Sequence, residues 1–121
     1  MILVDSSVWI AHLRHGLPKL TERLNAAEVL GHPMVIGELA LGNLRQRSLI
    51  IGSLSDLPKA GVATDDEVLS FIERLRLFGL GIGYVDVHLL ASTRLTPDTR
   101  LWTLDRRLAD AAGRFGLAFE T

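Results

Sequence analysis

Two short apolar segments, one near each end of the sequence, run directly into an aspartate. The segment ILV at 2–4 is followed by Asp5, and LWTL at 101–104 is followed by Asp105. Apolar runs of this length are typical of buried strands in a parallel sheet, where helices join the strands. Both aspartates are therefore expected at the carboxyl edge of such a sheet, which is where open parallel sheets bind ligands.

The sequence between these segments is mostly helical in pattern. Helices are predicted over 6–14, 18–27, 33–44, 46–55, 64–77, 85–95 and 105–113. The spacing of Thr64 and Glu67 is that of a capping box. A short strand or turn is predicted over 80–84, and a last short strand over 117–119. Strands alternating with helices predict an α/β fold, and the length predicts a single domain over 1–121.

The composition narrows the chemistry open to this chain. The absence of cysteine excludes disulfides, zinc–thiolate sites and cysteine nucleophiles. No apolar run approaches the roughly 18 residues needed to cross a bilayer, so we expect a cytoplasmic protein that does not enter a membrane. The formal net charge of −1 creates no global attraction for nucleic acid. The basic residues are mostly arginine, however, and arginine suits planar contacts to phosphate.

Three acids stand alone in stretches that otherwise look buried. Histidines aside, Asp5, Glu38 and Asp86 are the only charged residues of 1–13, 33–44 and 77–93, respectively. An unpaired buried carboxylate is unfavourable, so each acid is expected to have a partner or a ligand. No lysine or arginine within these stretches can serve as that partner.

Convergence of these acids with Asp105 would predict a metal site. Two carboxylates about 4 Å apart repel each other by roughly 4 kcal/mol at an effective dielectric constant near 20. A divalent cation relieves that repulsion, and all-oxygen ligands favour Mg²⁺ or Mn²⁺ over zinc. Such a site can activate water and clamp a phosphate oxygen, as phosphodiester hydrolysis requires.

Each acid also has a plainer interpretation. Asp5, Asp86 and Asp105 each lie close to the start of a predicted helix and could serve only as caps. Glu38 could pair with a distant arginine. These alternatives stay open for each acid taken alone, although all four holding together is less expected than a shared site.

Four motifs around these acids are similar to those of a known family. They are VDSSVWI around Asp5, GELALG around Glu38, GYVDVHLLAS around Asp86 and LWTLDRRLA around Asp105. In their order and spacing, across essentially the whole chain, they resemble the PIN-domain ribonucleases, and in particular the VapC-type toxins of bacterial toxin–antitoxin pairs.

The resemblance implies a fold and an activity. The fold would be a PIN-like three-layer α/β/α sandwich with a central, mainly parallel sheet. One or two Mg²⁺ or Mn²⁺ ions would be surrounded by the catalytic acids Asp5, Glu38, Asp86 and Asp105. The enzyme would be an endoribonuclease in which water activated by the metal attacks an RNA phosphodiester and leaves 5′-phosphate and 3′-hydroxyl ends.

Two hydroxyl residues lie beside the outermost acids. Ser6 follows Asp5, and Thr103 lies two positions before Asp105. By position they match the small hydroxyl residues of the family. They could support a ligand or water in the site, or merely form hydrogen bonds with nearby backbone.

The resemblance also implies partners. Such toxins usually cleave structured RNA, often tRNA or rRNA, form homodimers, and are silenced by a cognate VapB-type antitoxin that reaches into the acidic site. Binding of RNA requires positive charge near the acids. The arginines predicted to contact phosphates are Arg45, Arg47, Arg94 and Arg106. The apolar stretch 46–57 is predicted to form an antitoxin groove or a dimer contact.

Two other functions would also fit parts of this sequence pattern. One is a catalytically silent PIN-like module that binds RNA or protein, and the retention of all four acids argues against it. The other is a phosphatase with a strand-end aspartate as nucleophile. That class would carry a second aspartate at position 7, where this chain has Ser7.

Overall fold

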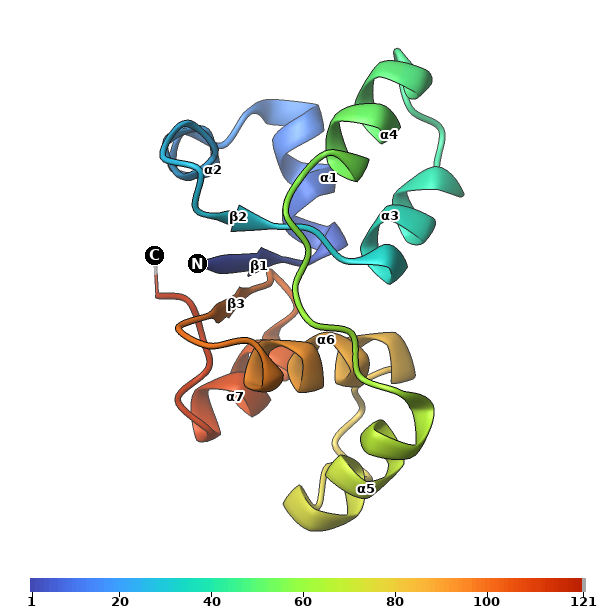
Figure 1. Ribbon diagram of the computed structural model, residues 1–121, viewed down its shortest axis with the longest axis vertical. Coiled ribbons are helices and arrows are strands. Elements are labelled where there is room, and N and C mark those ends of the chain that lie inside the picture. The colour runs from blue at the N-terminus through green and yellow to red at the C-terminus, as the bar shows by residue number, and fades with distance from the viewer. Residues whose placement is uncertain (121) are drawn as a thin grey trace.

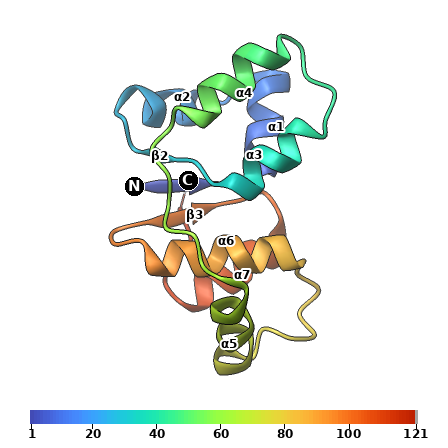
Figure 2. The same cartoon turned by 45° about the vertical axis from the view of Figure 1, so that its right-hand side comes forward.

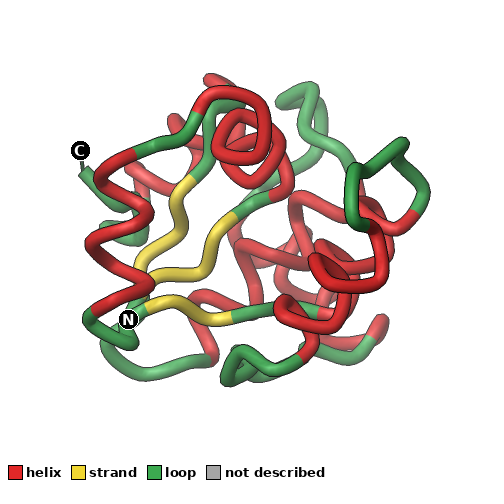
Figure 3. The backbone as a smooth tube through the Cα atoms, turned by 90° about the horizontal axis from the view of Figure 1, so that it is seen from above, coloured by secondary structure: helices red, strands yellow, loops and turns green. Residues whose placement is uncertain are grey.

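The computed structural model describes residues 1–120; Thr121, the last residue of the predicted domain 1–121, lies outside the described part. At its centre is a sheet of short strands, β1 (Ile2–Val4), β2 (Val29–Leu30) and β3 (Arg100–Trp102). The strand order is β2-β1-β3, and both pairings are parallel. Figure 3 shows the sheet face-on, with the strands side by side. β1, the central strand, is buried along its whole length because sheet neighbours flank it and helices cover both of its faces.

Helices cover both faces of the sheet (Figures 1 and 2). On one face lie α1 (Ser6–His15), α2 (Pro18–Asn25), α3 (Pro33–Ala40) and α4 (Arg47–Ser55). On the other face lie α5 (Asp65–Leu75), α6 (Tyr84–Leu95) and α7 (Arg106–Arg114). This arrangement confirms the predicted three-layer α/β/α, PIN-like fold with a parallel sheet. Within residues 1–120, no helix combines the length and the apolar character that a membrane span requires.

The helix α6 is the most deeply packed of these elements. Its residues from Val87 to Thr93 are all buried, and Leu89 and Leu90 have no exposed surface. Burial of a leucine side chain stabilises a fold by roughly 1.5–3 kcal/mol, so this helix is firmly anchored. Asp86 lies in its first turn. The carboxyl end of β1 lies on the same side of the molecule as α3 and the start of α6 (Figure 1).

Several predicted boundaries were wrong. The helix predicted over 33–44 ends at Ala40, and the strand predicted over 101–104 spans Arg100–Trp102. Residues 80–83 contain no strand; they form an irregular connection in which Gly81 has a positive φ of 75°, and Tyr84 already begins α6. The strand predicted over 117–119 is a single bridge between Ala118 and Leu101. The two-residue strand β2 was not predicted, because a strand so short leaves no periodic pattern.

A buried histidine joins α3 to α6. His32 has no exposed surface; its Nδ1 accepts a hydrogen bond from the Met34 backbone N–H at 3.1 Å and so caps α3. Its Nε2 lies 3.0 Å from the Ser92 hydroxyl of α6. Burial, and secondarily the nearby His88, lower the pKa of His32 from 6.5 to about 4. The fold therefore holds this ring neutral.

His32 should make the fold sensitive to mild acid. The unfolded chain binds a proton on this ring near pH 6.5, whereas the folded protein does so only near pH 4. The stabilisation is complete above pH 6.5 and is lost as the pH falls toward 4, by about 3 kcal/mol at most. Urea unfolding at pH 7.5 and 4.5 measures it. His32→Asn keeps a capping acceptor and should show a shallower loss between these pH values; an equal loss in both proteins would contradict this role.

Candidate active site

Asp5 ends β1 as a buried carboxylate. Its backbone N–H donates to the Trp102 carbonyl at 2.9 Å, which continues the pairing of β1 with β3 and brings Asp5 beside Thr103. Only 3% of the residue is exposed. Oδ1 accepts from the Ser6 backbone N–H at 2.7 Å, and Oδ2 accepts from the hydroxyls of Ser7 and Thr103, each at 2.7 Å. These short bonds to a charged acceptor fix the orientation of the carboxylate.

Ser6 connects Asp5 to Glu38. The Ser6 hydroxyl lies 3.0 Å from Oε1 of Glu38 and 3.4 Å from Oδ1 of Asp5. Glu38 belongs to α3 and is exposed to solvent. Two acids that are far apart in the sequence therefore meet across one serine side chain, at the carboxyl end of β1.

Asp86 lies within the electrostatic reach of the other acids. Burial raises the pKa of the Asp86 carboxyl above its usual range, and the charge of Asp5 raises it further. A hydrogen bond with the Gly83 backbone acts in the opposite direction, while Asp105 and Glu38 add smaller upward effects on this pKa. The four acids singled out in the sequence are therefore brought together at one edge of the sheet.

Asp105 is exposed and also caps a helix. Its Oδ1 accepts from the Leu108 backbone N–H at 3.1 Å, at the start of α7. Its own N–H donates to the Thr103 hydroxyl at 3.0 Å. Asp5 likewise caps α1. Asp5 and Asp105 therefore both cap helices, as the plainer interpretation expected, and both also lie near enough to Asp86 to affect its pKa.

The acidic cluster, meaning Asp5, Glu38, Asp86 and Asp105, has no basic partner in the described part of the chain. The salt bridges among residues 1–120 are Arg23–Glu28 and His88–Asp65, and neither involves the cluster. As placed, no three acidic or histidine side chains of these residues surround a common point closely enough to hold an ion. The carboxylates are oriented instead by hydroxyls and backbone N–H groups. Their oxygens are nevertheless the donors that Mg²⁺ and Mn²⁺ prefer.

The sequence is similar to that of curated ribonucleases. No family model matches the sequence. Two curated proteins, both called Ribonuclease VapC32, are from Mycobacterium tuberculosis strains CDC 1551 / Oshkosh and ATCC 25618 / H37Rv. Each is 48% identical over 118 residues, which cover 98% of this chain and 95% of the relative. The chain belongs to the VapC family of PIN-domain ribonucleases. The family predicted from the four acidic motifs is thereby confirmed.

The arginines predicted to contact RNA occupy different places relative to the acidic cluster of this VapC-family chain. Arg45 lines the same groove as Glu38. Arg106 follows Asp105 directly at the start of α7. Arg47 donates a hydrogen bond to the Gly42 carbonyl at 3.3 Å.

The last of these arginines, Arg94, is not beside the acids. It lies in the last turn of α6, whereas Asp86 lies in the first. It lines a different pocket, between α5 and α6.

Two hydrogen-bonding roles in this VapC-family chain were not predicted. Ser7 donates to Asp5 Oδ2, and its hydroxyl also accepts from the Leu104 N–H at 3.0 Å, so it holds the two strand ends together. Its position next to Ser6, in the first turn of a helix, was the sequence feature that could have indicated this role. Asp65 was assigned only to a helix start, yet its Oδ1 lies 3.1 Å from the buried His88 Nε2. No feature of the sequence pairs these two residues.

Proposed function

We propose that the protein is a Mg²⁺- or Mn²⁺-dependent endoribonuclease toxin that hydrolyses phosphodiester bonds of structured RNA, such as tRNA or rRNA. The observation that supports this most is the gathering of the acids: the Ser6 hydroxyl joins Asp5 to Glu38, the Thr103 hydroxyl joins Asp5 to Asp105, and no salt bridge among residues 1–120 offsets their charge. Burial and these neighbouring carboxylates also raise the pKa of Asp86. A cluster of this kind favours a hard divalent cation over a structural role. The name of the curated relatives, ribonuclease, points to the same chemistry.

Asp5, Glu38, Asp86 and Asp105 would hold the ion. When bound, a divalent cation supplies positive charge that offsets the carboxylates and polarises a phosphate oxygen. The other contributions come from the chain itself. Asp5, fixed by three short hydrogen bonds, is the rigid member of the cluster. Asp86 lies in the first turn of the buried helix α6, where burial and the neighbouring carboxylates raise the pKa of its carboxyl, so a bound cation would favour its ionised form.

A cognate VapB-type antitoxin is proposed as the protein partner. A groove of about 540 Å³ lies between α1, α3 and α4, and Glu38 forms part of its wall. Its apolar lining includes Leu13, Leu39 and, from the stretch 46–57 singled out in the sequence, Ile50. A peptide segment seated there would contact Glu38 and block access to the acidic cluster. A homodimer is proposed as well, and light scattering of the purified protein tests it.

Cleavage of total cellular RNA by the purified protein tests the function. Discrete fragments that form with Mn²⁺ and not with EDTA, and that carry 5′-phosphate ends, are expected. End mapping of those fragments identifies the target RNA. Binding of RNA without any cleavage, with Mn²⁺ present, would contradict the nuclease and favour a silent PIN-like binding module.

Thr103→Val tests whether the Thr103 hydroxyl aids RNA cleavage by orienting Asp5, apart from any effect on the stability of the fold. The valine removes a hydroxyl that donates to Asp5 Oδ2 at 2.7 Å and accepts from the Asp105 N–H at 3.0 Å. Loss of a bond to a charged group costs on the order of 2 kcal/mol, so cleavage should fall roughly thirtyfold if the whole loss appears in the transition state. Initial cleavage rates and melting temperatures measure both effects.

Thr99→Val is the matched control for this substitution. Thr99 is 2% exposed, and its hydroxyl donates to the Pro97 carbonyl at 3.0 Å, away from the acids. It should lose comparable stability and keep its cleavage rate. Equal cleavage rates in the Thr103→Val protein and the unmodified protein would rule out the proposed support of Asp5.

A further inference from the structure

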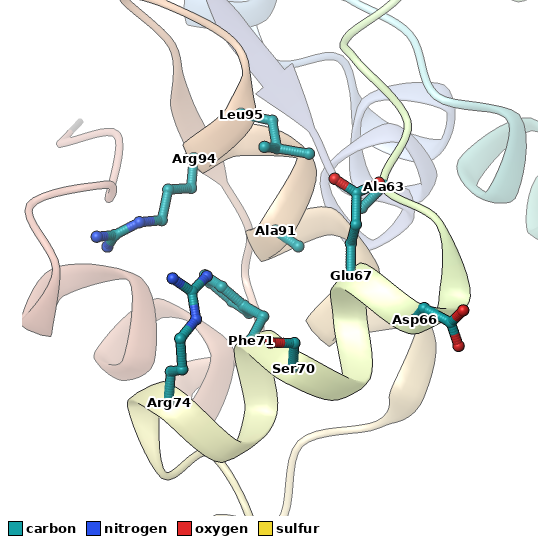
Figure 4. A pocket seen from close by; sticks show the side chains of 9 residues that line it. All are labelled: Ala63, Asp66, Glu67, Ser70, Phe71, Arg74, Ala91, Arg94 and Leu95. Atoms are coloured by element: carbon teal, nitrogen blue, oxygen red, sulfur yellow. The ribbon is translucent and has the colours of Figure 1, made fainter.

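A second pocket lies between α5 and α6, apart from the acidic cluster (Figure 4). Its volume is about 490 Å³. Phe71, Ala91 and Leu95 give it an apolar lining, and Ser70 adds a hydroxyl. None of the four acids of the cluster lines it. The pocket is therefore a feature of the helical layer that the proposed catalytic chemistry does not use.

Two arginines dominate one side of this pocket. Arg74 comes from the last turn of α5 and Arg94 from the last turn of α6. Figure 4 shows both guanidinium groups extending to the same side of the pocket. Over the described range 1–120, neither side chain takes part in a salt bridge or donates a hydrogen bond. Two like charges that share an opening without an anion repel each other, and a bound anion would relieve this repulsion.

The acids that also line the pocket do not neutralise these arginines. The Glu67 carboxylate accepts from the Thr64 backbone N–H at 2.9 Å in the capping box of α5. Asp66 points away from both arginines (Figure 4). The guanidinium side of the pocket is therefore locally positive, although the protein as a whole carries a formal net charge of −1.

We propose that Arg74 and Arg94 form a binding site for a backbone phosphate of the RNA substrate, distant from the cut; this rests on the proposed function. Guanidinium groups bind phosphate through paired N–H donors. The apolar lining and the Ser70 hydroxyl suit the adjoining sugar. The sequence singled out Arg94 as an RNA contact, but the partnership with Arg74 emerges only from the packing of α5 on α6.

The helix α6 sets the spacing between this pocket and the acidic cluster. Arg94 lies eight residues after Asp86 on one continuous helix, which corresponds to about 12 Å along its axis. A phosphate held at this pocket would therefore belong to a different nucleotide from the one at the acidic cluster. An RNA long enough to span both sites would be held at two points, and a shorter one would not.

Salt-dependent RNA binding tests the pocket. Binding of the target RNA is measured in an Asp5→Asn background with Mn²⁺, so that cleavage does not interfere, for the parent and for Arg74→Ala/Arg94→Ala. The double variant should bind at least tenfold more weakly near 150 mM salt. The slope of log K against log salt should become shallower by about 1.5, because each lost contact removes roughly 0.7–0.9. Arg74→Lys/Arg94→Lys should recover most of the slope and only part of the affinity.

Arg114→Ala controls for the loss of surface positive charge, one charge where the double variant loses two, since Arg114 ends α7, lies over the Phe115 ring and is outside this pocket. It should leave the affinity within about twofold of the parent. An unchanged affinity and slope in the double variant, with an unchanged melting temperature, would overturn the proposed site. An equal loss with Arg114→Ala would also overturn it, because the effect would then reflect net charge. Failure of the nuclease itself appears separately, as absence of cleavage by the unmodified protein.

Discussion

Replacement of Asp5 by asparagine is expected to reduce RNA cleavage by a factor of 100 to 1,000 or more while the fold is kept. The substitution removes a charge from the most buried carboxylate of the acidic cluster, and loss of several kcal/mol of charge stabilisation corresponds to that factor. The fold should survive because asparagine caps helices as well as aspartate does. The hydroxyls of Ser7 and Thr103 can rotate to accept from the new amide. Cleavage rates with Mn²⁺, together with circular dichroism, measure both effects.

Asp56→Asn is the control for the loss of one negative charge. Asp56 is exposed at the end of α4 and is no part of the acidic cluster. Its cleavage rate should match that of the unmodified protein. Full activity of the Asp5→Asn protein would show that the acidic cluster is not the nuclease centre.

Binding of Mn²⁺ should raise the melting temperature strongly. A ligand that binds only the folded state stabilises it by about 2.7 kcal/mol at one hundred times its dissociation constant. For a chain of this size that corresponds to a rise of roughly 10 °C. Differential scanning calorimetry at pH 7.5, with and without millimolar Mn²⁺, measures the rise.

Asp86→Asn should change this behaviour in two ways. The pKa of Asp86 is raised in the fold, so its ionised form opposes folding at pH values above that pKa, and this opposition disappears as the pH falls through it. The metal-free variant should therefore melt at a higher temperature than the unmodified protein at pH 7.5. It should also gain much less from Mn²⁺. Two outcomes would show that Asp86 does not belong to a cation site with mutually repelling acids. One is a metal-free melting temperature below that of the unmodified protein, and the other is a Mn²⁺-induced rise equal to that of the unmodified protein.

The fold and the acids were predictable because both depend on local signals. Asp5 and Asp105 follow short apolar runs, and the exclusion of unpaired charge from a core makes Glu38 and Asp86 conspicuous. The capping box of Thr64 and Glu67 was predicted from spacing alone and is confirmed at 2.9 and 3.1 Å.

The features that were missed depend on contacts between distant segments. The strand β2 exists because β1 offers it a partner, and its two residues carry no pattern of their own. The hydrogen bond of Ser6 to Glu38 joins α1 to α3, and the pairing of Asp65 with His88 joins α5 to α6. Arg74 likewise gains its proposed role only because α5 packs with its last turn close to that of α6. Such proximities are fixed by tertiary packing, which a single sequence does not display.

Strand ends and helices together hold the acids in place. β1 and β3 bring Asp5 and Thr103 into contact, while the buried helix α6 holds Asp86 in place. Hydroxyls of Ser6, Ser7 and Thr103 orient the carboxylates without neutralising them. The remaining negative charge is what a divalent cation would offset.

Anomalous diffraction from crystals soaked with Mn²⁺ tests this claim most directly. A manganese peak is expected at the carboxyl edge of the sheet, within roughly 2–2.5 Å of carboxylate oxygens from Asp5 and Asp86. Its occupancy should fall sharply in crystals of Asp5→Asn. A manganese peak on other residues, with none at this edge under saturating Mn²⁺, would contradict a metal-dependent nuclease centre built on these acids.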